Sequence, residues 1–111
     1  MDKLKKYREV VENILTEHAA IPYAYGEIER RTLFDQAKDS YLLYIVGWDN
    51  DGRVHGIITH LDIINCKIWI QRDGTEDGIA DDLESAGVLK SDIVLAWHEP
   101  ELRKYTDYAV A

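Results

Sequence analysis

The sequence predicts an α+β fold: an N-terminal helix, an antiparallel β-meander of about four strands, then a C-terminal helix and an irregular tail. Three observations lead to this fold class. An apolar stripe with helical spacing ends before Pro22, four strand-like segments with short turns follow, and the last strand runs into a second stretch of helical spacing. The 111 residues, 46% hydrophobic and 31% charged, are enough for a single domain spanning residues 1–111 whose core needs no disulfide or metal.

The N-terminal helix is predicted over residues 2–19. Its apolar residues Tyr7, Val11 and Ile14 recur every three or four positions, which places them on one side of a helix. Pro22 lacks the backbone N–H that would continue the helical hydrogen bonds, so we expect the helix to end before it.

Four segments rich in β-branched and aromatic residues predict the strands of the meander. Their bounds are Glu27–Asp35, Tyr41–Trp48, Arg53–Asn65 and Lys67–Asp73. The run Asp49–Gly52 is typical of a hairpin turn between the second and third strands. Alternation along the third strand predicts that His60 and Asp62 lie on one face of the sheet and His55 on the other.

The second helix is predicted over Thr75–Ala86, where Ile79 and Leu83 are one turn apart. Asp73 is a good N-cap, and Glu76 stands three residues later, as in a capping box. The helix is therefore expected to begin directly after the fourth strand.

The last part of the chain is less regular. Residues 88–97 are short and apolar, and their spacing fits either a fifth strand or a helical turn. Pro100 interrupts the pattern, and residues 101–111 are expected to form an irregular tail held by apolar anchors. The anchors are Leu102, Tyr105, Tyr108 and Val110.

The second strand is apolar on both faces, because Leu42 and Tyr44 alternate with Leu43 and Ile45. Such a sheet must be covered on both faces, yet only two helices are predicted. The helices can straddle the sheet, the tail can wrap the second face, or a second subunit can cover it. A homodimer is therefore one expected assembly, since two-fold dimers are the commonest oligomers.

The chain is acidic, with a formal net charge of −8 and a pI near 4.8. This charge argues against direct binding to nucleic acid or to an anionic membrane, because both need a basic face. A local exception is the basic group Lys3, Lys5, Lys6 and Arg8, which offers a competing hypothesis of DNA binding. With no apolar targeting segment or membrane span, the protein is expected to be cytoplasmic.

Enzyme signatures are absent from the sequence, and we expect no cofactor and no bound metal. There is no H-E-x-x-H, G-x-S-x-G or Walker A motif, and the single cysteine, Cys66, cannot build a thiolate site. The competing hypothesis is a metal-dependent or hydrolase-like enzyme that uses His60, Asp62 and Asp73. The acidic residues near the second helix are more simply explained by the helix dipole. They are Asp73, Glu76, Asp77, Asp81 and Asp82.

Several separated motifs resemble one known family. The run Lys67–Gln71 followed by Asp73-x-Thr75-Glu76-x-x-Ile79-Ala80 is similar to the signature of the XisI family, the fdxN element excision controlling factor proteins of cyanobacteria. Upstream matches are Tyr41-x-Leu43, Gly47-Trp48, Arg53-x-His55-Gly56 and His60; downstream matches are Gly87-Val88, Asp92–Leu95, Pro100, Arg103, Tyr105-Thr106 and Ala109–Ala111. The resemblance covers essentially the whole chain. Departures are mild: Leu89 and Lys104 stand where proline is expected, and Ala96-Trp97 where Gly-Phe is expected.

The resemblance implies an accessory factor that controls excision of a DNA element by a site-specific recombinase. It also implies a companion, an XisH-like protein that resembles nucleases, so this chain is expected to be regulatory and not an enzyme. The family has no established catalytic residues to carry over. The matched polar residues are candidates for a partner or ligand surface: His55, His60, Arg72, Asp73, Thr75, Glu76 and Arg103.

Overall fold

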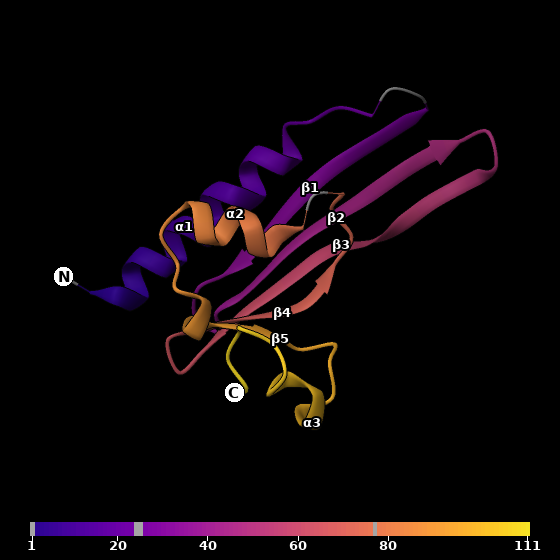
Figure 1. Cartoon of the computed structure of the whole chain (residues 1–111). Coiled ribbons are helices and arrows are strands. Elements are labelled where there is room, and N and C mark those ends of the chain that lie inside the picture. The colour runs from indigo at the N-terminus through magenta and orange to yellow at the C-terminus, as the bar shows by residue number, and fades with distance from the viewer. Residues whose placement is uncertain (1, 24–25, 77) are drawn as a thin grey trace.

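The predicted fold class is confirmed by the computed structural model, which describes residues 2–23, 26–76 and 78–111. The elements in order are α1 (Lys3–Ala19), β1 (Glu27–Asp35), β2 (Ser40–Asp49), β3 (Gly52–Ile64), β4 (Lys67–Asp73), α2 (Ile79–Ser85), the 3₁₀ turn η1 (Lys90–Asp92), β5 (Ile93–Leu95) and α3 (Pro100–Arg103). The strands form one sheet in the order β1-β2-β3-β4-β5 (Figure 1).

The predicted four-stranded meander is correct, and a short fifth strand extends it. Strands β1 to β4 pair antiparallel, whereas β5 pairs parallel to β4. A parallel pair needs a crossover connection, and the segment containing α2 provides it. Both expectations for residues 88–97 are realised in part, since a 3₁₀ turn leads directly into a strand.

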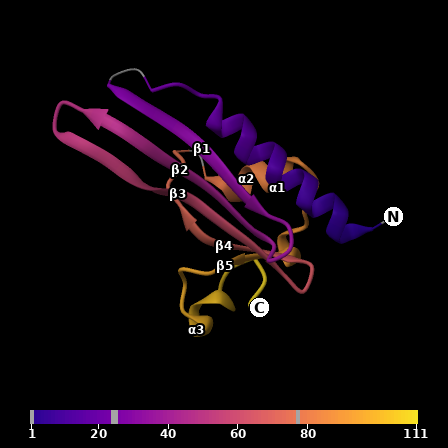
Figure 2. The ribbon, with the colours of Figure 1, turned by 180° about the vertical axis from the view of Figure 1, so that it is seen from behind.

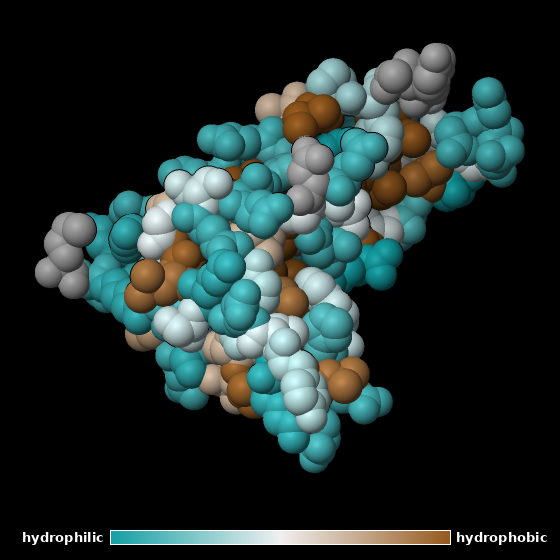
Figure 3. Space-filling view, in the orientation of Figure 1, coloured by the Kyte–Doolittle hydropathy of each residue, from teal (hydrophilic) through white to brown (hydrophobic). Residues whose placement is uncertain are grey.

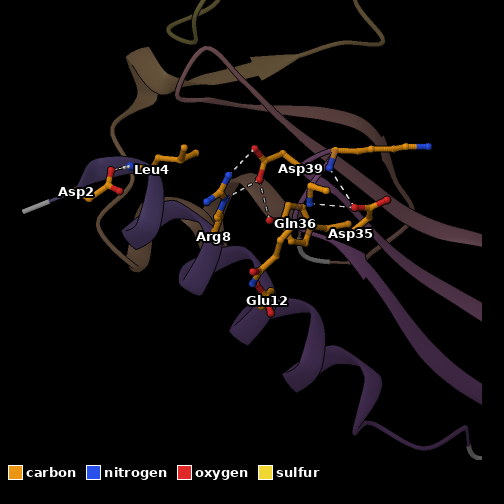
Figure 4. A network of polar contacts seen from close by, with 10 residues as sticks. Asp2, Leu4, Arg8, Glu12, Asp35, Gln36 and Asp39 are labelled. Carbon is orange, nitrogen blue, oxygen red and sulfur yellow. Dashed lines mark hydrogen bonds and ion pairs between the residues drawn. The ribbon is translucent and has the colours of Figure 1, made fainter.

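Helix α1 begins at the N-cap Asp2, whose carboxylate accepts a hydrogen bond of 3.0 Å from the backbone N–H of Leu4. Hydrogen bonds also connect α1 to the turn between β1 and β2 (Figure 4). There the Arg8 guanidinium donates two hydrogen bonds, 2.7 and 3.0 Å long, to the Asp39 carboxylate. Tyr41 donates a further bond of 3.0 Å to Asp39. The Arg8 and Tyr41 hydrogen bonds lower the pKa of Asp39 even though burial acts against them.

The predicted start of the second helix is wrong. Helix α2 begins at Ile79 and not at Thr75, and its N-cap is Gly78, with φ of 87° and no side-chain cap. The cause is a tertiary contact: the N–H of Gly74 donates a 2.7 Å hydrogen bond to the carbonyl of Ile58 on β3, which holds the residues after β4 in a loop. The predicted capping box is accordingly not formed.

Both longer helices lie on the same face of the sheet (Figures 1 and 2). The side chains between them and the sheet form the core, which includes Tyr7, Val11 and Leu15 of α1, Leu43, Leu61 and Ile70 of the sheet, and Ile79 and Leu83 of α2. The outer surface of this side is mainly hydrophilic over α1 and α2 (Figure 3). No helix in the described ranges is long and apolar enough to cross a membrane.

Among the described residues, those that cover the second face of the sheet belong to the tail and lie at its β4–β5 end. Arg103 of α3 lies over the ring of Trp69 on this face, 5.2 Å from its centroid. Ala109 forms a parallel bridge with Val94 and so continues the sheet at the edge beyond β5. The helices therefore do not straddle the sheet, and the tail covers the second face in part. Residues of β1, β2 and β3 on this face have no other described element against them (Figure 2).

Candidate functional site

The first group of candidate residues lies on the second face of the sheet because of a β-bulge. The pairing of β2 with β3 shifts register so that Leu43 faces Thr59 and Tyr44 faces Ile57, which leaves Ile58 as the extra residue. Beyond a bulge the alternation of side chains is reversed. His55 and His60 therefore share one face, and the predicted placement of His55 on the face opposite to His60 is wrong.

A polar cluster around Asp62 occupies this face. The Oδ1 atom of Asp62 accepts a hydrogen bond of 2.7 Å from the Ser40 hydroxyl and lies 3.0 Å from Nε2 of His60. Its Oδ2 atom accepts a bond of 3.2 Å from the side-chain amide of Gln71. Gln71 reaches Asp62 because a second register shift, at His60–Leu61, leaves it as the extra residue on β4. The Asp62 carboxylate is thus held by three strands.

Arg72 stands directly across from His60 in the pairing of β3 with β4. Its Nε atom donates a 2.8 Å hydrogen bond to the carbonyl of Ile57, and the side chain is exposed. Arg72 also borders a hollow of about 490 Å³ together with Gln71, Asp73 and Trp97. His55, His60 and Arg72 are thereby brought together on one surface.

Asp73, Thr75 and Glu76 form a separate group in the loop that leads into α2. The Oδ1 atom of Asp73 accepts hydrogen bonds from the N–H of Thr75 at 2.9 Å and from its hydroxyl at 2.5 Å. The Oδ2 atom accepts one from the N–H of Ile79 at 2.8 Å. Both carboxylate oxygens therefore shape the loop and satisfy the start of α2. Glu76 is exposed.

Arg103 belongs to the tail and binds it to the sheet beside Trp69, the partner of Asp62 in the pairing of β3 with β4. Its guanidinium donates to the carbonyls of Ala96, His98 and Val110, at 3.2, 2.9 and 3.2 Å. With Trp69 beneath it, this side chain makes its contacts within the fold.

One pair of ionisable groups with shifted pKa values, Tyr7 and Asp92, lies away from these candidates, under the first turn of α1. Burial and a 2.5 Å hydrogen bond to Asp92 raise the pKa of Tyr7 to about 12. Asp92 is buried, which by itself raises its pKa, but hydrogen bonds from Lys3 and Tyr7 lower it overall. This network joins α1 to the start of β5 and is structural.

The residues required by the metal-dependent alternative do not converge. Asp73 pairs with Thr59, on the face opposite to His60 and Asp62, and its oxygens are already occupied. Over residues 2–23, 26–76 and 78–111, no group of three or more His, Cys, Asp or Glu side chains is arranged to hold a metal ion. Asp77, which the sequence places in the acidic cluster, lies outside the described residues.

Comparison with known proteins gives a consistent match over nearly the whole chain. The model of the XisI protein family matches residues 1–110. The chain belongs to the XisI family. No protein with a curated functional description matches it.

Two solved structures extend the XisI match to three dimensions. A XisI-like protein from Anabaena variabilis ATCC 29413 is 36% identical, with a TM-score of 0.89, and the match covers 97% of this chain and 99% of the other. The fdxN element excision controlling factor XisI from the same organism is 37% identical, with a TM-score of 0.79, and the match covers 99% and 100% of the two chains.

The XisI motifs thus coincide with two structural features that residue-by-residue reasoning missed. Ser40 and Gln71 hold Asp62, although neither was a candidate; Gln71 stands in the motif Lys67–Gln71, which was the available signal. The motif residues Gly47 and Trp48 lie where β1 and β2 meet, and Trp48 is 57% exposed on the second face of the sheet.

Proposed function

We propose that this chain is an accessory factor that controls excision of a DNA element through contact with an XisH-like protein in the cytoplasm, without catalysing the reaction itself. The observation that carries the proposal is the match over nearly the full chain to a structure named as an fdxN element excision controlling factor.

A groove between α1 and α2 is the surface that best fits this partner. It has a volume of about 510 Å³, an apolar floor that includes Val10, Ile14 and Ile21, and acidic side chains from Glu17 and Asp82. A nucleic-acid-binding partner carries a basic surface, so acidic rims around an apolar groove offer it complementary charge. The net charge of −8 adds a long-range attraction to the same partner.

The acidic residues on and near the α1–α2 groove differ in whether they already make contacts within the fold. Asp82 lies 2.8 Å from Nε2 of His18, and Glu84 accepts a 2.8 Å hydrogen bond from Tyr108. Asp81 and Glu17 are exposed. Reversing the charge of Asp82 or Glu84 would break contacts within the fold, whereas Glu17 can be changed without that complication.

The first test is co-expression with an XisH-like protein from the same genome, followed by size-exclusion chromatography with light scattering. We expect a stable complex containing both chains. Separate elution of the two proteins at all concentrations would contradict the proposal. A complex would then be assayed for nuclease activity with and without this chain, which distinguishes a regulator from a passive binder.

The second test maps the contact. Glu17→Lys removes an acidic rim and places a cation in the last turn of α1, where the helix dipole favours it, so the fold is expected to be unaffected. Affinity for the partner is expected to fall at least tenfold at low salt. Asp51→Lys makes the same charge change in the β2–β3 turn and should leave affinity within about twofold. Equal losses in both variants would show a nonspecific charge effect.

Direct DNA binding receives less support from the basic group at the start of α1. Lys3 pairs with Asp92 at 2.6 Å, and Arg8 pairs with Asp39. Two of the four cations are thus neutralised within the fold, which leaves Lys5 and Lys6.

Among the seven sequence candidates, His55, Arg72 and Glu76 are exposed and remain our candidates for a contact surface, together with the half-exposed His60.

A further inference from the structure

The uncovered face of β1, β2 and β3 is unusually apolar for a surface left open to solvent. Leu33, Trp48 and Ile57 are 58%, 57% and 44% exposed on it. Leu42, Tyr44 and Val46 of β2 lie between them on the same face. Clustered large apolar side chains on an open sheet face indicate a surface that meets another molecule.

The charges on this face follow the register of the strands. Reading across the sheet, successive rows contain one residue from each of β1, β2 and β3. In the first two rows an acidic residue on β1 and a basic or imidazole residue on β3 flank an apolar residue on β2. From the β2–β3 turn inward, the rows are Glu27–Trp48–Arg53, Glu29–Val46–His55, Arg31–Tyr44–Ile57 and Leu33–Leu42–His60.

We propose that a second copy of this chain covers this face, with the two-fold axis running between the sheets and parallel to the strands. Such an axis exchanges the β1 and β3 sides and keeps every row at its own level. Glu27 of one copy then lies over Arg53 of the other, and Glu29 over His55, while the apolar residues of β2 pack on one another. Stacked sheets with aligned strands pack about 10 Å apart, within reach of these side chains.

Charge balance favours a second copy over a basic partner. The chain has a net charge of −8, so two copies attract only through a surface whose own charges cancel. In the four rows, Glu27 and Glu29 are balanced by Arg31 and Arg53. The next row, Asp35–Ser40–Asp62, adds two carboxylates, so the balance is confined to these four rows. Within them a basic protein would find no excess negative charge, whereas the α1–α2 groove offers it. A two-fold axis perpendicular to the strands would instead place β1 over β1 and reverse the order of the rows, so it would bring neither Glu27 over Arg53 nor Glu29 over His55.

The face also provides room for a large side chain. A hollow of about 610 Å³ lies between the acidic and basic rims, lined by Glu27, Glu29, Arg31, Val46 and Arg53 among others. Trp48 stands at the level of this hollow, with Arg53 over its ring at 5.5 Å. In the proposed dimer the two Trp48 side chains face each other, and the hollow of each copy leaves room beside them.

The test is light scattering after size-exclusion chromatography of the purified chain over a dilution series. We expect twice the 12.8 kDa chain mass for the unmodified protein. Trp48→Glu and Leu33→Glu, both at exposed positions, are expected to abolish the dimer while circular dichroism stays unchanged. Leu89→Glu alters a residue that is 60% exposed elsewhere and should leave the dimer intact. A monomer at every concentration, or a dimer that survives both face variants, would overturn the proposal.

A charge exchange tests the direction of the axis. Arg53→Glu places like charges opposite each other and is expected to dissociate the dimer. Adding Glu27→Arg restores opposite charges in the proposed arrangement and should restore the dimer. Failure of the double variant to dimerise, with Trp48→Glu monomeric, would overturn the two-fold arrangement. Because no XisH-like protein is present, these outcomes are independent of the proposed function.

Discussion

At the scale of single residues, the same residue types serve different purposes according to what surrounds them. Arg72 and Arg103 both belong to the motifs shared with the XisI family, but one is exposed and the other donates to three backbone carbonyls. A guanidinium has five N–H donors in a rigid plane, so it can satisfy several carbonyls while stacking on an aromatic ring. Arg103 is accordingly a fold residue, and Arg72 is the better candidate for an intermolecular contact, on the second face of the sheet.

Replacing Arg103 tests this assignment. Arg103→Lys keeps the charge but loses the planar set of donors, and we expect the free energy of unfolding to fall by roughly 1–3 kcal/mol. Urea denaturation followed by tryptophan fluorescence measures the change. Binding to the XisH-like protein should be retained under native conditions. An unchanged urea midpoint would show that the three hydrogen bonds contribute little.

The Arg8–Asp39 pair predicts a dependence of stability on pH. The pKa of Asp39 is lowered from 3.8 in the folded chain by its hydrogen bonds to Arg8 and Tyr41. As the pH falls, Asp39 is therefore protonated in the unfolded chain before it is protonated in the folded chain. The stability that the Arg8–Asp39 pair contributes is present above about pH 4 and is lost as the pH falls further. Asp39→Asn should flatten the stability curve in that range, as measured by urea midpoints at a series of pH values. Parallel curves for the two proteins would contradict the prediction.

At the scale of elements, the contact between β1 and β2 depends on the absence of one side chain. A Cβ atom built on Gly47 would lie 2.0 Å from the carbonyl oxygen of Glu27 and 2.7 Å from Cα of Ile28. Both neighbours are backbone atoms of β1, so neither can move without displacing the strand. Gly56, in the neighbouring strand, has nothing within 4 Å of such an atom.

These two glycines form a matched pair of tests. Gly47→Ala should separate β1 from β2 and lower the free energy of unfolding by about 2–4 kcal/mol, as expected when backbone is forced apart. Gly56→Ala should change it by less than about 1 kcal/mol. Thermal or urea denaturation of both variants gives the comparison. Similar losses in the two would mean that the strands adjust to the added methyl group.

At the scale of the whole molecule, the two proposed contact surfaces lie on opposite sides of the sheet. The α1–α2 groove is acidic, whereas the charges balance in the four rows of β1, β2 and β3 that the proposed dimer brings together. One surface can therefore bind a basic partner while the other binds a second copy. The resulting assembly would contain two copies of this chain with the partners on the outside.

Because the two surfaces lie on opposite sides of the sheet, a mutation in one is expected to change one interaction and leave the other intact. Glu17→Lys should weaken binding to the XisH-like protein and leave the dimer intact, and Trp48→Glu should dissociate the dimer and leave a complex with one copy of each chain. Light scattering of the co-expressed proteins distinguishes these assemblies by mass. Loss of both interactions in either variant would show that the surfaces are coupled.

Much of the fold was predictable because its signals are local. The spacing of Tyr7, Val11 and Ile14 predicted α1, and the turn at Asp49–Gly52 predicted the β2–β3 hairpin. The start of α2 was not predictable, because the carbonyl that holds Gly74 belongs to Ile58, a residue of another strand. The role of Arg103 was missed for the same reason, since Ala96 and Val110 are brought to it by the path of the tail.

The sequence by itself determined the types of α1, α2 and the first four strands, the order of those strands, the net charge and the family, because these depend on neighbouring residues and on motifs along the chain. The tertiary structure decided which face each side chain occupies. The bulge at Ile58 moved His55 to the face of His60, and the docking of both helices on one side left the other face of β1, β2 and β3 open. A bulge and a choice of face depend on contacts between segments far apart in the chain, and periodicity within one segment carries no information about them.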